Sequence, residues 1–112
     1  RRECMRILRH EAGHVVQYAF GLHRRRRWQK LFGRASKRYP EHYQPNPASK
    51  NYVQYLRRWY AQCHPDEDFA ETSVLASPAR SAAGLLQGAE RAFQRRAVTS
   101  AVTSAGRITS KR

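Results

Sequence analysis

The sequence of 112 residues is poor in cysteine, in long apolar runs and in acidic side chains. Cys4 and Cys63 are its only cysteines, too few for a disulfide framework, which favours a reducing, cytosolic setting. No apolar run approaches the roughly 20 residues that a membrane-spanning helix needs, and no segment has the pattern of a signal peptide. The length suits one domain, and because the chain begins at Arg1 we expect its start to be incomplete.

The scarcity of acidic residues leaves a strongly basic chain. Lys and Arg number 22 against 8 Asp and Glu, which gives a formal net charge of +14. Such a charge is compatible with nucleic acid or an acidic partner, and Arg24 to Arg27 with Trp28 form the densest basic stretch. A solvated helix face explains this stretch more simply, so we do not favour nucleic acid. Half of the acidic residues lie together between positions 66 and 71.

Apolar residues recur at steps of three and four along the first part of the chain, at Cys4, Leu8, Ala12, Val15, Val16 and Ala19. This period predicts a helix over residues 2–20 that ends before Gly21, with Cys4 in the core. We further predict a short helix near residues 25–32, an irregular Pro-rich loop near 36–48, a helical piece near 49–60 and a helix that begins at Pro65.

The composition changes after Thr72. Residues 73–112 are mostly Ala, Ser, Thr, Arg and Gly, and Phe93 is their only aromatic residue. We expect Pro78 to end the preceding helix at about its third turn, some helix near 81–98 and disorder from about 97. The sequence therefore divides into a core over residues 1–76 and a basic tail over 77–112 that is either divergent or translated out of frame.

One motif carries the chemistry. His10-Glu11-Ala12-Gly13-His14 matches H-E-x-x-H. Residues four apart share a helix face, so both imidazoles can reach one metal ion, and neutral histidine nitrogens are standard zinc ligands. Glu11 would then face the open coordination position, where it could take a proton from the water that zinc activates and pass it to the leaving amine. Two solvated or core histidines on an amphipathic helix are the structural alternative.

A zinc site of this type needs a third protein ligand. The metzincin pattern requires Gly at position 17 and His at position 20, and Gln17 and Phe20 exclude it. His23 lies beyond the predicted helix end and is a poor candidate. Glu67 and Glu71 remain, on one face of a later helix. One could bind the metal while the other holds a ligand histidine, whereas an ordinary acidic helix start is the alternative.

These motifs resemble a known family. Residues 6–72 are similar to the bacterial zinc-binding metallopeptidases, of the gluzincin-like group that also contains the lethal-factor-type peptidases. The similarity rests on H-E-A-G-H at residues 10–14, on Trp28, Leu31-Phe32-Gly33 and Trp59-Tyr60, and on H-P-D-E-D-F-A-E-T at residues 64–72. It implies that this mainly α chain is a fragment of a zincin-like domain, in which the two motif-bearing helices face each other.

The resemblance also implies a role for each site residue. His10, His14 and Glu67 would bind Zn²⁺, Glu11 would be the general base, and Glu71 would orient a ligand histidine. Related peptidases place an oxyanion-stabilising tyrosine seven residues before the ligand Glu, and Tyr60 occupies that position here. A core aromatic residue beside Trp59 is the alternative for Tyr60.

The chain departs from the family directly after Thr72. Family members continue with an apolar, aromatic-rich helix, whereas this chain reads Ser73-Val74-Leu75-Ala76-Ser77-Pro78. A divergent or out-of-frame end would remove core packing from the helix that carries Glu67.

Three functional hypotheses follow. The first is a zinc-dependent peptidase that hydrolyses peptide or protein substrates, with loss of activity in this fragment as one outcome. The second is a non-catalytic basic module that binds nucleic acid or an acidic partner, in which the histidines are incidental. The third is a pseudo-enzyme that keeps the metal and does no chemistry. Metal analysis separates the second hypothesis from the others, and Glu11→Gln separates the first from the third.

Overall fold

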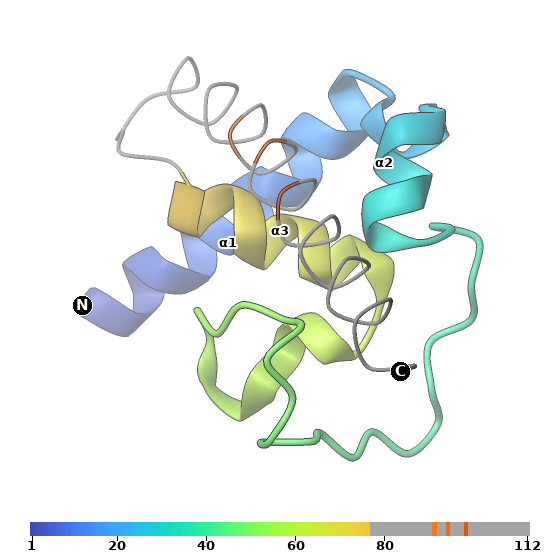
Figure 1. The fold of residues 1–112 in the computed structure, drawn as a ribbon. Coiled ribbons are helices and arrows are strands. Elements are labelled where there is room, and N and C mark those ends of the chain that lie inside the picture. The colour runs from blue at the N-terminus through green and yellow to red at the C-terminus, as the bar shows by residue number, and fades with distance from the viewer. Residues whose placement is uncertain (77–90, 92–93, 95–97, 99–112) are drawn as a thin grey trace, which may run out of the picture.

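The computed structural model describes residues 1–76, 91, 94 and 98. Within this part of the chain the fold is helical and contains no strand, which confirms the mainly α prediction. Its elements are α1 (Arg2–Ala19), the 3₁₀-helix η1 (Leu22–Arg24), α2 (Arg26–Phe32), the 3₁₀-helix η2 (Arg57–Gln62) and α3 (Pro65–Ala76). Figure 1 shows α3 lying across α1, with α2 at one end and the irregular segment between α2 and η2 running around the edge of the molecule.

Most of the predicted elements are confirmed. The helices expected at residues 2–20, at 25–32 and from Pro65 are present as α1, α2 and α3, and residues 36–48 are irregular. None of the helices in the described residues has both the length and the apolar character needed to cross a membrane. The predictions for the tail fall mainly on residues 77–112 and lie outside the described part of the chain, apart from three isolated positions.

The helical piece predicted near residues 49–60 is confirmed only at its end. Residues 49–56 are irregular, and only Arg57–Gln62 form a 3₁₀-helix, in which Arg58 and Trp59 have the left-handed φ angles 67° and 51°. A buried carboxylate explains the difference, because Glu71 accepts hydrogen bonds from the backbone N–H groups of Tyr55 and Leu56 and holds them extended. The Tyr43 hydroxyl lies within hydrogen-bond distance of the carbonyl oxygens of the two left-handed residues and donates its one proton there.

The buried face of α1 is the one that carries the two histidines and not the one on which Cys4 lies. Cys4 is exposed, and Leu8 and Val15 are 55% and 66% exposed, so the placement of Cys4 in the core is wrong. The buried residues of α1 are His10, Gly13, Val16 and Gln17. The helical period was therefore predicted correctly, but the polar stripe that carries the motif packs on α3, and most of the apolar stripe faces outward.

Helix α3 is the centre of the molecule. It contacts α1, α2 and η2, and every residue from Pro65 to Ala76 except Leu75 is buried. Against one end of α3 the rings of Trp28, Phe32 and Phe69 pack with centroids 5.3 to 5.9 Å apart. This aromatic cluster joins α2 to α3, and burial of three large rings contributes several kcal/mol to stability by the usual area relation, roughly 2 kcal/mol for each.

Gly13 sets the separation of α1 and α3. A Cβ atom at this position would lie 3.0 Å from Ser73 Oγ and 3.1 Å from Ala70 Cα. Contacts with a backbone atom at such a distance cannot be relieved by rotating a side chain, so the helices would have to move apart. The absence of a side chain at Gly13 therefore allows the backbones to approach closely within the motif itself.

We predict that Gly13→Ala destabilises the protein. The added methyl group overpacks the helix contact at a cost of about 1–3 kcal/mol, which outweighs the gain of up to about 1 kcal/mol in helix propensity. Chemical denaturation followed by circular dichroism measures the change. The control is Ala19→Ser, which adds one atom at an exposed position of the same helix. An alanine variant as stable as the parent would show that the helices are not in limiting contact at this position.

Candidate metal centre

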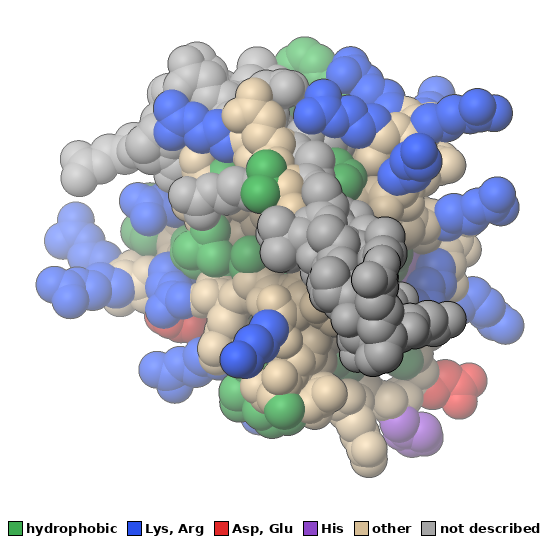
Figure 2. Space-filling view, in the orientation of Figure 1, with side chains coloured by type: hydrophobic (Ala, Val, Ile, Leu, Met, Phe, Trp, Pro, Cys, Tyr) green, Lys and Arg blue, Asp and Glu red, His purple; other side chains and the backbone are tan. Residues whose placement is uncertain are grey.

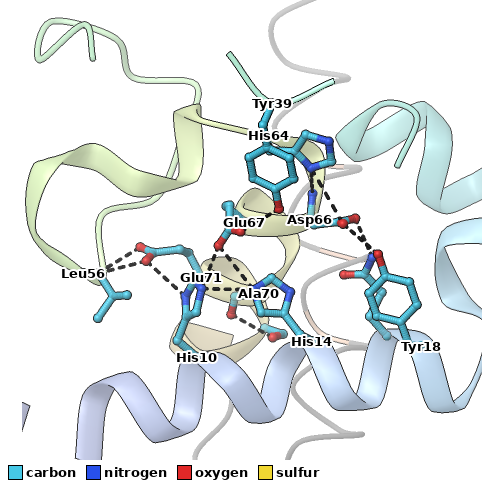
Figure 3. A network of polar contacts seen from close by, with 12 residues as sticks. His10, His14, Tyr18, Tyr39, Leu56, His64, Asp66, Glu67, Ala70 and Glu71 are labelled. Atoms are coloured by element: carbon cyan, nitrogen blue, oxygen red, sulfur yellow. Dashed lines mark hydrogen bonds and ion pairs between the residues drawn. The ribbon is translucent and has the colours of Figure 1, made fainter. Parts of the chain in front are cut away.

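Helices α1 and α3 bring three potential metal ligands together. His10 and His14, one turn apart on α1, point at Glu67 in the first turn of α3 (Figure 3). The Nε2 atoms of the two histidines are 3.2 Å apart, and Glu67 Oε2 lies 2.8 Å from His10 Nε2 and 3.3 Å from His14 Nε2. Three ligand atoms from two helices thus form a small triangle.

The triangle has the dimensions of a zinc site. Tetrahedral coordination with bonds of about 2.0–2.2 Å places neighbouring ligand atoms about 3.3 Å apart. The two imidazole nitrogens and the carboxylate oxygen are also the donors that catalytic zinc sites use, with three protein ligands and one open position. His10, His14 and Glu67 are therefore positioned to hold a metal ion.

The electrostatics of the metal-free site are those of a buried ion pair. Burial opposes protonation of His10, but the hydrogen bond to Glu67 and the nearby Glu71 carboxylate outweigh it and raise the pKa of His10 to about 9. Burial also opposes ionisation of Glu67, yet hydrogen bonds from His10, His14 and Tyr39 hold the pKa of Glu67 well below its usual range. Without metal, a proton on His10 compensates the Glu67 charge.

Glu71 lies behind His10, on the side away from Glu67. Its side chain is fully buried, and Oε1 is 3.4 Å from His10 Nδ1. This is an ion-pair distance, and among the described residues His10 Nδ1 has no hydrogen-bond partner. Glu71 also accepts hydrogen bonds of 2.8 Å from the Tyr55 N–H and of 3.0 and 3.2 Å from the Leu56 N–H. The carboxylate therefore links the first histidine of the motif to the backbone that leads into η2.

Asp66 fixes the first turn of α3 on α1. Gln17 Nε2 donates to Asp66 Oδ1 at 2.6 Å, and the Tyr18 hydroxyl donates to Asp66 Oδ2 at 2.8 Å. The Asp66 N–H donates a hydrogen bond of 3.1 Å to Nδ1 of His64, the residue directly before α3. Sequence reasoning missed these contacts. A signal existed for Gln17, because it lies seven residues after His10 and so on the same helix face.

Tyr39 was also missed by the sequence analysis. It lies in the irregular segment after α2, and its hydroxyl donates a 2.8 Å hydrogen bond to Glu67 Oε1. Its ring stacks on the His64 ring, with centroids 3.9 Å apart and an interplanar angle of 3°. No periodic pattern in this segment could have selected one tyrosine from several.

Glu11 and Tyr60 lie at the same cavity as the three ligands. The cavity has a volume of about 410 Å³ and is lined by His10, Glu11, His14, Tyr18, Tyr39, Tyr60, Asp66 and Glu67. Glu11 is exposed to solvent, and the Tyr60 ring centroid is 5.8 Å from that of His10. The structure thus brings the residues that the sequence selected into one cavity, except Glu71, which lies behind His10.

We predict that the stability of the metal-free protein falls as the pH rises from about 6.5 to about 9. The pKa of His10 is 6.5 in a model peptide and about 9 in the fold, so the folded state binds more protons across this interval and loses that advantage as they dissociate. The loss should total roughly 3 kcal/mol. Denaturation in a chelator at several pH values measures it.

The control for this measurement replaces histidines one at a time. His10→Gln should remove most of the pH dependence, whereas His42→Gln, at an exposed position, should leave it in place. A parent protein whose stability is constant between pH 6.5 and 9 would contradict the ion pair between His10 and Glu67.

Comparison with known proteins agrees with this geometry. The model of one family, described as putative zinc-binding metallo-peptidase, matches residues 1–76. Searches of curated proteins and of solved structures returned no match. The matched range contains the histidine motif, all of α3 and the cavity between them. Since the match extends over well more than half of the sequence, the chain belongs to the putative zinc-binding metallo-peptidase family.

Proposed function

We propose that this domain is a zinc-dependent peptidase that hydrolyses peptide bonds in peptide or protein substrates. One observation carries the proposal: His10 Nε2, His14 Nε2 and Glu67 Oε2 converge at zinc-ligand spacing, and Glu11 lies at the same cavity. Zinc held by these three atoms would polarise the scissile carbonyl and make water a stronger nucleophile at neutral pH. The family to which the chain belongs supports the same reaction class.

Glu11 is the general base in this proposal. It follows His10 directly on α1, but its side chain is exposed at the cavity and binds no ligand atom. A carboxylate in this place takes a proton from the attacking water and returns it to the leaving amine. The ligand Glu67, by contrast, is buried and held by hydrogen bonds.

Tyr60 is the proposed donor to the developing oxyanion. Burial and the nearby Glu67 carboxylate raise the pKa of Tyr60, so its hydroxyl keeps its proton at neutral pH and can donate a hydrogen bond. The residue is still 37% exposed at the cavity and can therefore reach a bound substrate. Exposure of this extent argues against the alternative that Tyr60 is a core aromatic residue.

Glu71 completes the proposed division of roles by orienting His10. The distance of 3.4 Å between Glu71 Oε1 and His10 Nδ1 supports the assignment. A carboxylate beside Nδ1 of a histidine fixes the ring so that Nε2 points toward the metal. A ligand Glu followed four residues later by an orienting Glu is also the arrangement that the resemblance to gluzincin-like peptidases implies. We extend that relationship to this chain as part of the proposal.

The basic surface gives weaker support to the alternative, a non-catalytic module that binds nucleic acid or an acidic partner, than the metal centre gives to a peptidase. Figure 2 shows Lys and Arg side chains around the periphery of the visible face, including the side of α2. Arg24 to Arg27 are exposed, but Trp28, the aromatic residue of this stretch, is fully buried and cannot stack on a base. The stretch therefore provides positive charge without an aromatic platform, as a solvated helix face does.

We predict that Glu11→Gln retains zinc and abolishes turnover. The amide preserves the size of the side chain but cannot accept the proton, so the rate should fall by about 10²–10⁴. Zinc stoichiometry and hydrolysis of a fluorogenic peptide library are measured on the same samples. Glu3→Gln, the same change in the first turn of α1, serves as the control. Hydrolysis by Glu11→Gln at the parent rate would refute the peptidase proposal and leave the metal site standing.

We predict that Tyr60→Phe lowers the rate of peptide hydrolysis by about 10²–10³ and leaves zinc affinity unchanged. Loss of the hydroxyl removes a donor to the oxyanion but no metal ligand. Tyr52→Phe is the matched control, because Tyr52 is exposed to a similar extent, at 40%, and lies outside the cavity of the metal centre. Equal rates for the Tyr60 and Tyr52 variants would remove Tyr60 from the proposed catalytic residues.

A further inference from the structure

Both oxygens of the Glu67 carboxylate are engaged, and by different partners. Oε2 faces the two histidines at 2.8 and 3.3 Å. Oε1 accepts the hydrogen bond of 2.8 Å from the Tyr39 hydroxyl (Figure 3). The two oxygens of this ligand are therefore distinguished by the protein itself, since only one of them is directed at the point where the ligand atoms converge.

Packing alone does not account for the position of Tyr39. The residue is 50% exposed, although its hydroxyl reaches a carboxylate of a residue that is only 6% exposed. An exposed tyrosine of a long irregular segment would not be held over a buried ligand by the hydrophobic effect. The specific feature of Tyr39 is thus its hydroxyl contact with Glu67.

A second contact fixes the Tyr39 ring. It stacks on the imidazole of His64, which is 3% exposed. His64 accepts from the Asp66 N–H at Nδ1, and its Nε2 donates to the carbonyl oxygen of Lys37. Each ring nitrogen of His64 therefore has a backbone partner, one in α3 and one in the segment that carries Tyr39. His64, which directly precedes the helix that carries Glu67, therefore also positions the Tyr39 ring.

We propose that Tyr39 is a positioning residue that holds Glu67 Oε1 and so leaves Oε2 alone to bind the metal. This inference rests on the proposed function, because it concerns the same metal site. A carboxylate that is free at both oxygens can bind a cation through both of them and occupy a further coordination position. With Oε1 occupied by Tyr39, Glu67 contributes one oxygen, and the fourth position of a tetrahedral site stays open for the reaction.

Tyr39 and Tyr60, which both line the cavity, then have separate tasks. The Tyr39 hydroxyl has one proton, and it is donated to Glu67, so it is not free to stabilise an oxyanion. Tyr60 lies on the side of His10 and makes no such contact with the ligand carboxylate. Loss of the Tyr39 hydroxyl should therefore change metal binding first, and loss of the Tyr60 hydroxyl should change the rate alone.

The test compares Tyr39→Phe with Tyr43→Phe in the full chain. Phenylalanine at position 39 keeps the stack on His64 and removes only the hydroxyl. Tyr43 is the matched control, because it lies in the same irregular segment, its hydroxyl bonds to a backbone carbonyl of η2, and it lies outside the lining of the cavity. Zinc affinity is measured by competition with a chelator, and X-ray absorption at the zinc edge reports the oxygen ligands. Thermal unfolding without metal checks that each variant is folded.

We expect Tyr39→Phe to bind zinc about 10–100-fold more weakly than the parent, with a second carboxylate oxygen in the coordination shell, and Tyr43→Phe to bind like the parent. A parent protein that binds no zinc would overturn the proposed function and this inference with it. If the parent binds zinc through both histidines and Tyr39→Phe is indistinguishable from it, the inference fails and the proposed function stands. Equal losses in both variants would also overturn it, because the effect would then follow from the loss of any tyrosine hydroxyl in this segment.

Discussion

The close approach of α1 and α3 at Gly13 is the constraint on which the rest of the structure depends. The two histidines flank this glycine within one turn, and Glu67 and Glu71 flank Ala70 on the facing helix. The distances from Glu67 Oε2 to the two histidine nitrogens therefore depend on the separation of the two backbones. Rigid helices can hold a catalytic constellation within the fraction of an ångström that chemistry needs, which loops rarely do.

Polar side chains form a large part of the interface between these two helices, beside the apolar cluster that includes Val16 and Phe69. Asp66, Glu67 and Glu71 are buried together, and burial of ionised groups costs several kcal/mol for each unless partners are supplied. Asp66 accepts hydrogen bonds from Gln17 and Tyr18. Glu67 is bound by the two histidines and by Tyr39. Glu71 accepts from the backbone of residues 55–56 and lies against His10. Folding and the charge state of the site are consequently coupled, since the interface that joins the helices is the site.

The sequence determines the motif-bearing helices and their ligands better than it determines the surroundings. Spacing of three and four predicted α1, and the acidic turn after Pro65 predicted α3, because helix geometry is local. The same period could not tell which stripe of α1 is covered, so Cys4 was assigned to the wrong side. Tyr39 and the extended residues near Tyr55 depend on contacts with α3, and such tertiary contacts leave no periodic signal.

The left-handed pair Arg58 and Trp59 has a consequence for how one wall of the cavity is held. Non-glycine residues in this conformation cost about 1–2 kcal/mol each, and here the contact with the Tyr43 hydroxyl and the backbone bonds to Glu71 offset that cost. The η2 turn that carries Tyr60 is therefore kept in shape by contacts from outside itself, and one of them comes from the carboxylate that also lies against His10. The proposed oxyanion donor and the first candidate metal ligand are consequently tied to the same buried side chain, so a change at Glu71 would disturb both.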